Sequence, residues 1–194
     1  MNPLVIAIDS STTATKAIVV DTEGKVLALG RQDIDLLSPQ QGFGEHDPRQ
    51  WWTSTHDAVA QALAQLTPSE KERIAAFGIT HQRESFAPFA ADGTPLRNGI
   101  LWLDIRAADQ VQRYGTPEIH ALSGRPADVT PGLYKMAWLK ENEPESLAKA
   151  DKVTTVSAYI AFCLTGKWVD SAACADSLSL SNIKTLEYDD GLLE

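Results

Sequence analysis

The sequence predicts an α/β or mixed α+β fold, in one domain or in one domain with a subdomain, and three observations support this. Apolar runs at residues 4–8, 16–20 and 25–30 alternate with short polar tracts, which is typical of an antiparallel meander. A well-capped helix follows, and another strand comes after it at residues 74–80. The second half is more helical. This order of elements fits neither a helical bundle nor a β-sandwich.

Tight turns are expected between the first three strands. The small polar tract at residues 10–13 separates the first two. Asp21 to Gly24 separates the second and third, with Gly24 at the position where a positive φ is needed.

The first helix has start signals that agree with one another. Asp47 is a good N-cap, Pro48 suits the first helical position, and Gln50 can close a capping box. Residues with helical spacing predict its buried face: Trp52, Thr55, Val59, Leu63 and Leu66. Thr67 and Pro68 are expected to end the helix.

The remaining elements are shorter. Strands are predicted at residues 85–89, 95–102 and 153–156, and helices at 107–114, 133–142 and 157–164. The last helix has Ser157 as its expected N-cap and Gly166 just past its end.

Composition excludes several classes of protein. The 194 residues are 43% hydrophobic and carry a formal net charge of −9, which argues against a nucleic-acid partner. No apolar run approaches the ~20 residues needed to cross a bilayer, so no membrane partner is expected. The N-terminus does not resemble a signal peptide. Cys163 and Cys174 fall in different elements and are expected to be reduced thiols, which fits a cytoplasmic location.

The turn after the first strand has the residues that metal and phosphate chemistry needs. Asp9 ends a buried strand and can hold Mg²⁺, because hard cations prefer oxygen ligands. Thr12 and Thr13 offer hydroxyl and backbone N–H groups to phosphate oxygens, and Lys16 places a positive charge nearby. A hairpin in which these side chains only satisfy the turn backbone is an equally good interpretation of these residues alone.

This turn resembles the first phosphate motif of the FGGY carbohydrate kinases, a strand followed by Asp-x-Gly-Thr and then Lys or Arg. Asp9, Thr12 and Lys16 match, and Ser11 stands where the family usually has Gly. The resemblance implies ATP and Mg²⁺ as cofactors. Asp9 and Lys16 are then catalytic residues with Asp9 at the metal, and Ser11, Thr12 and Thr13 bind the nucleotide phosphates.

A second motif suits a polyhydroxyl ligand. Arg83 donates a fork of N–H groups and the adjacent Glu84 accepts hydroxyl protons, so together they can fix several neighbouring hydroxyls. Taken alone, such a pair is more often solvated surface charge. The segment resembles Ile-Thr-x-Gln-Arg-Glu of the glycerol kinase branch, which implies that Arg83 and Glu84 bind substrate.

Two further segments resemble the family. Trp102, Asp104 and Arg106 match Ile-x-Trp-x-Asp-x-Arg of many sugar kinases, which implies that Trp102 and Asp104 bind substrate. A core tryptophan and a buried structural ion pair are the alternatives. In the family helix that ends Lys-x-x-Trp-Leu, the tyrosine that contacts glycerol would fall at Thr130, and Tyr134 is expected on the helix face. Glycerol is therefore a less secure substrate than a longer polyol or pentulose.

The matches run in order along nearly the whole chain. They imply a ribonuclease H-like domain of the actin, Hsp70 and hexokinase superfamily, with a mixed sheet and flanking helices. Residues 1–194 would be most of the N-terminal substrate-binding domain, with the ATP-binding domain and the catalytic base beyond Glu194. The expected activity is phosphorylation of a small sugar or polyol by ATP, with this part alone inactive. The resemblance leaves a homodimer open.

Two other functions remain as alternatives. A non-catalytic polyol-binding or regulatory module on the same fold is favoured by Ser11 and by the short length. A nuclease on the same core would need several clustered carboxylates for two metal ions. Only Asp9 lies at a suitable strand end, and the acidic balance does not suit a nucleic acid.

Overall fold

A computed structural model describes residues 2–193, which form two compact units. The first unit consists of Met1–Leu36 and Pro48–Gln82. The second consists of Leu37–Asp47 and Arg83–Glu194. The chain therefore passes from one unit to the other three times.

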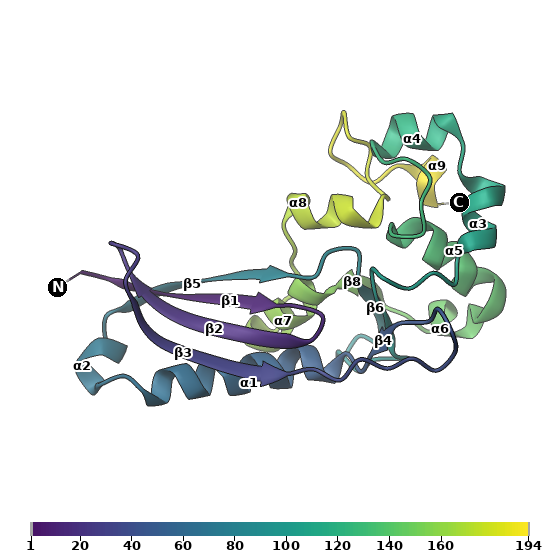
Figure 1. Cartoon of the computed structure of the whole chain (residues 1–194). Coiled ribbons are helices and arrows are strands. Elements are labelled where there is room, and N and C mark those ends of the chain that lie inside the picture. Colours follow the sequence, from purple (N-terminus) through teal and green to yellow (C-terminus); the bar gives the residue numbers. More distant parts are fainter. Residues whose placement is uncertain (1, 194) are drawn as a thin grey trace. The chain divides into compact units, whose positions relative to one another are not determined.

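The first unit is a four-stranded mixed sheet with helices (Figure 1). Its strands lie in the order β3-β2-β1-β5. β1 is antiparallel to β2, β2 is antiparallel to β3, and β5 is parallel to β1. The bounds are β1 Leu4–Ser10, β2 Ala14–Asp21, β3 Val26–Asp33, β5 Ile74–His81, α1 Arg49–Ala64 and α2 Pro68–Lys71. The predicted meander and the strand after the helix are confirmed.

The core of this unit lies between the sheet and α1. In β1, buried and partly buried residues alternate, as expected for a strand that presents one face to a helix. The fully or nearly fully buried members of this core are Leu4, Ile6, Ile8, Ala17, Val19, Ala28, Ala58, Ala62 and Leu66.

The predicted buried face of α1 is confirmed in part. Thr55 and Leu66 are buried, and Val59 and Leu63 pack partly buried against the core. Trp51 is fully buried where Trp52 was expected, and Ala58 and Ala62 lie deeper than Val59. Small residues are favoured because the helix lies very close to β3. A Cβ at Gly30 would lie 1.9 Å from the Ala58 carbonyl oxygen.

The predicted capping box of α1 is also wrong. Pro48 occupies the N-cap position and makes no side-chain cap hydrogen bond. Gln50 instead accepts from the Asp35 backbone N–H at 2.9 Å and donates to its carboxylate at 2.8 Å. A true capping box starts α2, between Thr67 and Glu70. Thr67 therefore begins a short helix rather than only ending α1.

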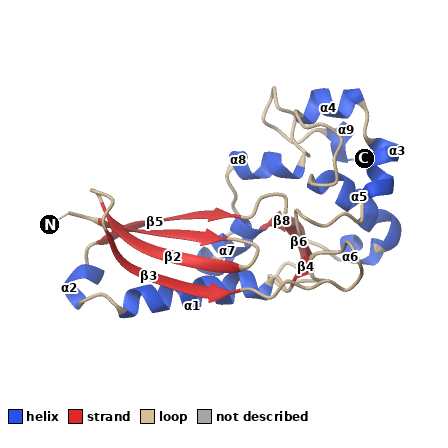
Figure 2. Cartoon of the chain, viewed as in Figure 1, coloured by secondary structure: helices blue, strands red, loops and turns tan. Residues whose placement is uncertain are grey.

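The second unit has a small antiparallel sheet in the order β4-β7-β6-β8, with the remaining helices around it (Figure 2). Its strands are β4 Glu45–His46, β6 Phe86–Phe89, β7 Gly99–Ile100 and β8 Lys152–Thr155. Its helices are α3 Ala108–Tyr114, α4 Pro117–Ser123, α5 Gly132–Asn142, α6 Pro144–Ala148, α7 Val156–Thr165, α8 Ala172–Ala175 and α9 Asp190–Leu193, with a 3₁₀ turn at Asp176–Leu178. A core of Phe86, Ile100, Leu139, Leu178 and Leu180 joins the sheet to α5.

Two predictions for this unit need correction. The strand expected at 95–102 is reduced to Gly99–Ile100, because side chains bond the backbone that follows it and hold a turn there. The N-cap of α7 is Thr155, whose hydroxyl accepts from the Ala158 N–H, and not Ser157. Ser157 instead donates to the Asp170 carboxylate at 2.6 Å.

Within residues 2–193, no helix combines the length and the apolar character needed to cross a bilayer.

Candidate active site

The phosphate turn lies in the first unit, between β1 and β2. Asp9 and Lys16 are directly opposite each other in the antiparallel register of these strands, and Thr80 of β5 neighbours Asp9 on its other side. Lys16 is exposed and Asp9 is partly buried. These three residues line a cavity of about 290 Å³ together with Ala7, Ile8 and Ile18. The structure thus brings the predicted carboxylate and cation to one place.

Ser11 is accommodated without backbone strain. Within the described residues, the only non-glycine positions with a positive φ are Glu84, Ser179 and Leu186, so Ser11 does not need the left-handed conformation that favours glycine. Its hydroxyl donates to Asp9 Oδ2 at 2.7 Å. Asp9 Oδ1 has no hydrogen-bond donor in the described part of the chain, so it is available to a ligand.

Gln82 closes the turn from the end of β5. Its backbone N–H donates to the Ser10 carbonyl at 2.9 Å, and its Nε2 is 3.4 Å from the Ser11 carbonyl. Thr12 donates to Gln82 Oε1 at 3.5 Å, while Thr13 is exposed. Sequence reasoning gave Gln82 no role of its own. The sequence feature that could have indicated a role is the position of Gln82 directly after a strand, here β5, which is parallel to β1.

The polyol segment lies in the second unit. Arg83 is exposed. Glu84 has a φ of 62°, in the left-handed region that non-glycine residues rarely adopt. Its N–H donates to the Ser177 hydroxyl at 3.3 Å, and its Oε1 accepts from Arg125 Nη1 at 2.8 Å. Strain of this kind persists only when neighbours hold it, and these two contacts do so.

Trp102 has a side chain 42% exposed on a firmly held backbone. Its N–H donates to the Ser85 hydroxyl at 3.1 Å. Its carbonyl accepts from Lys135 Nζ at 3.0 Å, and Lys135 also donates to the carbonyls of Leu101 and Thr130 at 2.8 and 3.0 Å. Trp102 is thus too exposed for a core residue, and the alternative of a core tryptophan does not hold.

Lys135 is fully buried, although its side chain is charged at neutral pH. Burial lowers the pKa of Lys135 to about 8, against the attraction of Asp104 and Glu84. The sequence analysis used this lysine only to align a helix. Its role in holding the Trp102 turn could not be read from the sequence, because it depends on the carbonyl groups of Leu101 and Trp102, which are far away in the chain.

Asp104 belongs to a buried structural ion pair. It is fully buried, and its Oδ1 accepts from Arg106 N–H and Nε, both at 2.9 Å. Its Oδ2 accepts from the Gly44 N–H and from Arg106 Nη2, both at 2.7 Å. A carboxylate has about four lone-pair sites, and these contacts fill them. The structure therefore leaves Asp104 no acceptor site for a substrate hydroxyl.

The same pair extends into a charged network around Glu45. Arg106 and Arg97 both donate to Glu45 Oε1, at 2.7 and 2.9 Å. Burial acts to raise the pKa of Glu45, but hydrogen bonds from Arg106 and Asn98 and the charge of Arg97 lower it overall. The Arg106 guanidinium lies 4.0 Å from the centre of the Phe43 ring. This network fixes the loop that carries Trp102.

The position of the missing tyrosine is occupied by a small side chain. Thr130 donates to the Asp128 carboxylate at 3.0 Å. Tyr134 lies in α5 and is only 2% exposed, as the sequence predicts for a residue on the helix face.

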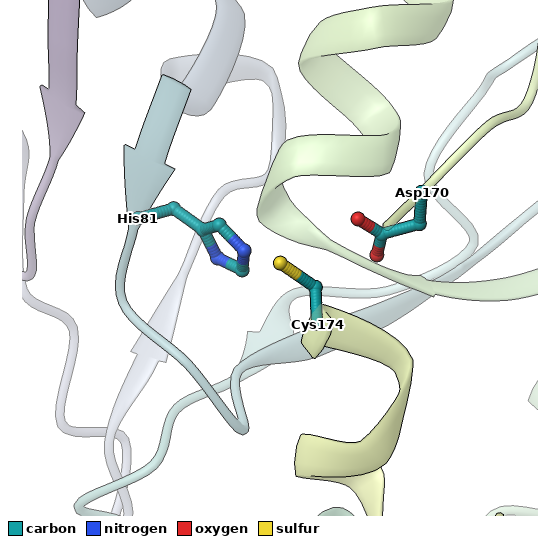
Figure 3. A group of neighbouring side chains, drawn as sticks. All are labelled: His81, Asp170 and Cys174. Atoms are coloured by element: carbon teal, nitrogen blue, oxygen red, sulfur yellow. The ribbon is translucent and has the colours of Figure 1, made fainter. Parts of the chain in front are cut away.

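Figure 3 draws His81 with Asp170 and Cys174, but the first belongs to the first unit and the other two to the second. The contacts of these side chains are therefore described within each unit separately. His81 Nδ1 lies 2.8 Å from the Gln82 carbonyl. Asp170 accepts from Ser157 and Thr155 and so anchors the start of α7. Cys174 and Cys163 are both free thiols, as predicted.

Comparison with known proteins connects these features to a family. The model of the N-terminal domain of the FGGY family of carbohydrate kinases matches residues 4–194. A glycerol kinase of Thermococcus gammatolerans is 35% identical over 204 residues, which is 100% of this chain and 41% of that protein. The chain thus spans about two fifths of such relatives.

Comparison with solved structures also finds carbohydrate kinases. A gluconate kinase from Lactobacillus acidophilus superposes with a TM-score of 0.92 at 29% identity, over 100% of this chain and 39% of that one. A glycerol kinase from Plasmodium falciparum, solved with ADP, has a TM-score of 0.86 at 24% identity, over 98% of this chain and 40% of that one. The second likeness concerns the fold alone.

Proposed function

Because the chain belongs to the FGGY family of carbohydrate kinases, we propose that it is the substrate-binding part of an enzyme that phosphorylates a small sugar or polyol with ATP. It has the mixed α/β fold of the N-terminal domains of these kinases. The observation that carries the proposal is the pairing of Asp9 with Lys16 across β1 and β2, beside an open carboxylate oxygen.

In this proposal the phosphate turn serves the transferred group. Asp9 would hold Mg²⁺ through Oδ1, because a carboxylate oxygen without a protein donor suits a hard cation. The metal ion, when bound, neutralises charge on the phosphate oxygens. Ser11 orients the carboxylate, Thr12 and Thr13 meet phosphate oxygens, and Lys16 places a positive charge close to them.

The polyol segment serves the acceptor. Arg83 donates to substrate hydroxyls, Glu84 accepts from them through Oε2, and the exposed face of Trp102 packs on the carbon skeleton. Asp104 supports the loop and does not touch the substrate. The base that takes the hydroxyl proton is expected in the part of the family's length that this chain does not span.

Two lesser parts of the proposal follow from it. Dependence on ATP, together with two free cysteines, supports a cytoplasmic location. The alternative of a non-catalytic module drew support from Ser11, but the backbone of Ser11 needs no strained conformation and its hydroxyl bonds Asp9. We therefore keep the kinase as the proposed function.

The test is a full-length enzyme with Asp9→Ala, assayed for phosphorylation of glycerol, erythritol, xylulose and ribulose. Loss of one charge-stabilising group should lower kcat by about a hundredfold or more and leave the fold intact. Asp21→Ala is the matched control, because Asp21 also ends a strand of the same sheet but faces the exposed turn to Lys25. Near-normal turnover by Asp9→Ala at saturating Mg²⁺ would refute the assignment.

A further inference from the structure

Arg125 is a positively charged side chain beside the polyol segment to which the sequence gave no role. It follows the end of α4, where Gly124 has a φ of 71° and ends the helix. The Arg125 N–H donates to the Ser123 hydroxyl at 3.3 Å, and Ser123 in turn donates to the Ile119 carbonyl at 2.8 Å. The backbone of Arg125 is thus fixed by the helix end, and its side chain points to a defined place.

The side chain of Arg125 points to the carboxylate of Glu84. Arg125 Nη1 lies 2.8 Å from Glu84 Oε1, and the side chains are 27% and 13% exposed. An ion pair that is this well shielded is stronger than an ordinary surface pair, because less water screens it. Glu84 is also held in its left-handed conformation at the backbone, so the pair cannot easily move apart.

The Arg125–Glu84 ion pair leaves further hydrogen-bonding groups of both side chains for a ligand. A guanidinium has five N–H donors in a rigid fork, and Nη1 alone has a partner among the side chains that the structure describes. Among those same side chains, none donates to Glu84 Oε2. One ion pair thus offers both a further acceptor and further donors, and neighbouring hydroxyls of a polyol match them, because each hydroxyl both donates and accepts.

We propose that Arg125 contacts the substrate directly and selects a polyol or ketose longer than glycerol. This rests on the proposed function. In it, Arg83 and Glu84 bind neighbouring hydroxyls of the acceptor. The remaining donors of Arg125 offer a partner to a fourth oxygen, which a four- or five-carbon substrate has and glycerol lacks. Lys135 donates to the Thr130 carbonyl and to the Trp102 carbonyl, so the segment that follows Arg125 and the loop that carries Trp102 are held by one side chain.

The fourth oxygen is a hydroxyl and not a carboxylate. Glu84 already neutralises much of the Arg125 charge. A second carboxylate at the vacant donors would lie close to Glu84 Oε2, and like charges at that range repel each other. A neutral hydroxyl meets the donors without this cost.

The experiment uses Arg125→Lys in the full-length enzyme. Lysine keeps the positive charge beside Glu84 but lacks the second arm of the fork. The KM for a four- or five-carbon substrate such as erythritol or ribulose should rise about tenfold or more, and the KM for glycerol should change less than about twofold. Arg113→Lys is the matched control, because Arg113 forms an exposed pair with Glu141 away from this segment.

The outcomes distinguish a direct substrate contact by Arg125 from a role in which Arg125 only positions Glu84. If Arg125 only positions Glu84, Arg125→Lys behaves as wild type with every substrate, or alters all substrates equally, and the inference is wrong. If a sugar acid such as gluconate shows the length-dependent loss and the neutral ligands do not, the assignment to a hydroxyl is wrong. If the wild-type enzyme phosphorylates none of these compounds, the proposed function itself fails, and the two failures are thereby distinguished.

Discussion

At the scale of single residues, the polar groups of the second unit divide into those that are saturated and those that are open. Asp104 has all its acceptor sites filled, whereas Glu84 and Arg125 have vacant sites and Trp102 has an exposed ring. A sequence motif places Asp104 and Glu84 in the same category, because both are acidic residues near strand ends. The count of hydrogen bonds is what distinguishes the supporting role given to Asp104 from the binding role proposed for Glu84.

Lys135 gives a prediction about pH. Its folded pKa of about 8 lies below the usual lysine value, so between these values the unfolded chain binds more protons than the folded chain. Stability from this group therefore rises as pH increases from 8. We expect the free energy of unfolding of wild type, relative to Lys135→Met, to increase by roughly 1–2 kcal/mol between pH 8 and 9.5.

Urea unfolding of both proteins across this pH range measures the difference. Taking the difference between the two proteins cancels the contribution to the free energy of unfolding from the tyrosines and from every other group that titrates in the same way in both. A difference that stays flat, or that falls as pH rises, would show that Lys135 keeps an ordinary pKa in the folded chain.

At the scale of elements, α1 approaches β3 so closely that there is no space for a side chain at Gly30. A Cβ at Gly30 would meet backbone atoms of Ala58 and Ala62, at 1.9 and 2.9 Å. Gly30→Ala should therefore lower the free energy of unfolding by about 1–3 kcal/mol, as overpacking does. Gly78→Ala is the control in β5 of the same sheet, because nothing lies within 4 Å of its Cβ position.

Thermal unfolding of the two variants tests this. Gly78→Ala is expected to be neutral or slightly stabilising, since it lowers the entropy of the unfolded chain. Equal stability of the two variants would mean that the helix and strand are not in tight contact.

Element types could be predicted from the sequence better than their ends. The strands of the first unit were found because each combines apolar periodicity with a turn signal. The centre of the buried face of α1 was missed because Ala58 and Ala62, which give a weak apolar signal, lie deepest in the core. The strand at 95–102 was overestimated because Lys135 bonds the carbonyls of Leu101 and Trp102 from another segment, and no local pattern reveals such contacts.

At the scale of the whole molecule, the chain spans about two fifths of its relatives, and our proposal places the catalytic base in the part of the family's length that the chain does not span. We expect the purified chain by itself to show no polyol-stimulated ATP hydrolysis. A coupled assay with each candidate substrate measures this. Substrate-stimulated turnover above background would mean that the base and the nucleotide site lie within these residues.

The candidate site could be predicted in part. Asp9, Lys16 and the Arg83–Glu84 pair stood out because strand-end motifs are local in sequence. Arg125 and Lys135 did not, because their roles arise only when α4 and α5 bring them to segments far away in the chain. Residues that act through long-range contacts are the part that sequence patterns alone leave out.

The central claim is that Arg83 and Glu84 bind substrate hydroxyls, and the most direct measurement is the KM of Arg83→Ala and Glu84→Gln in a full-length enzyme. Each charge-assisted hydrogen bond contributes about 1.5–3 kcal/mol, so the KM for the polyol should rise roughly ten- to a hundredfold. The KM for ATP and the unfolding temperature should stay near wild type, as in the control variants Arg113→Ala and Glu141→Gln. An unchanged polyol KM and kcat in both variants would show that the pair is ordinary surface charge.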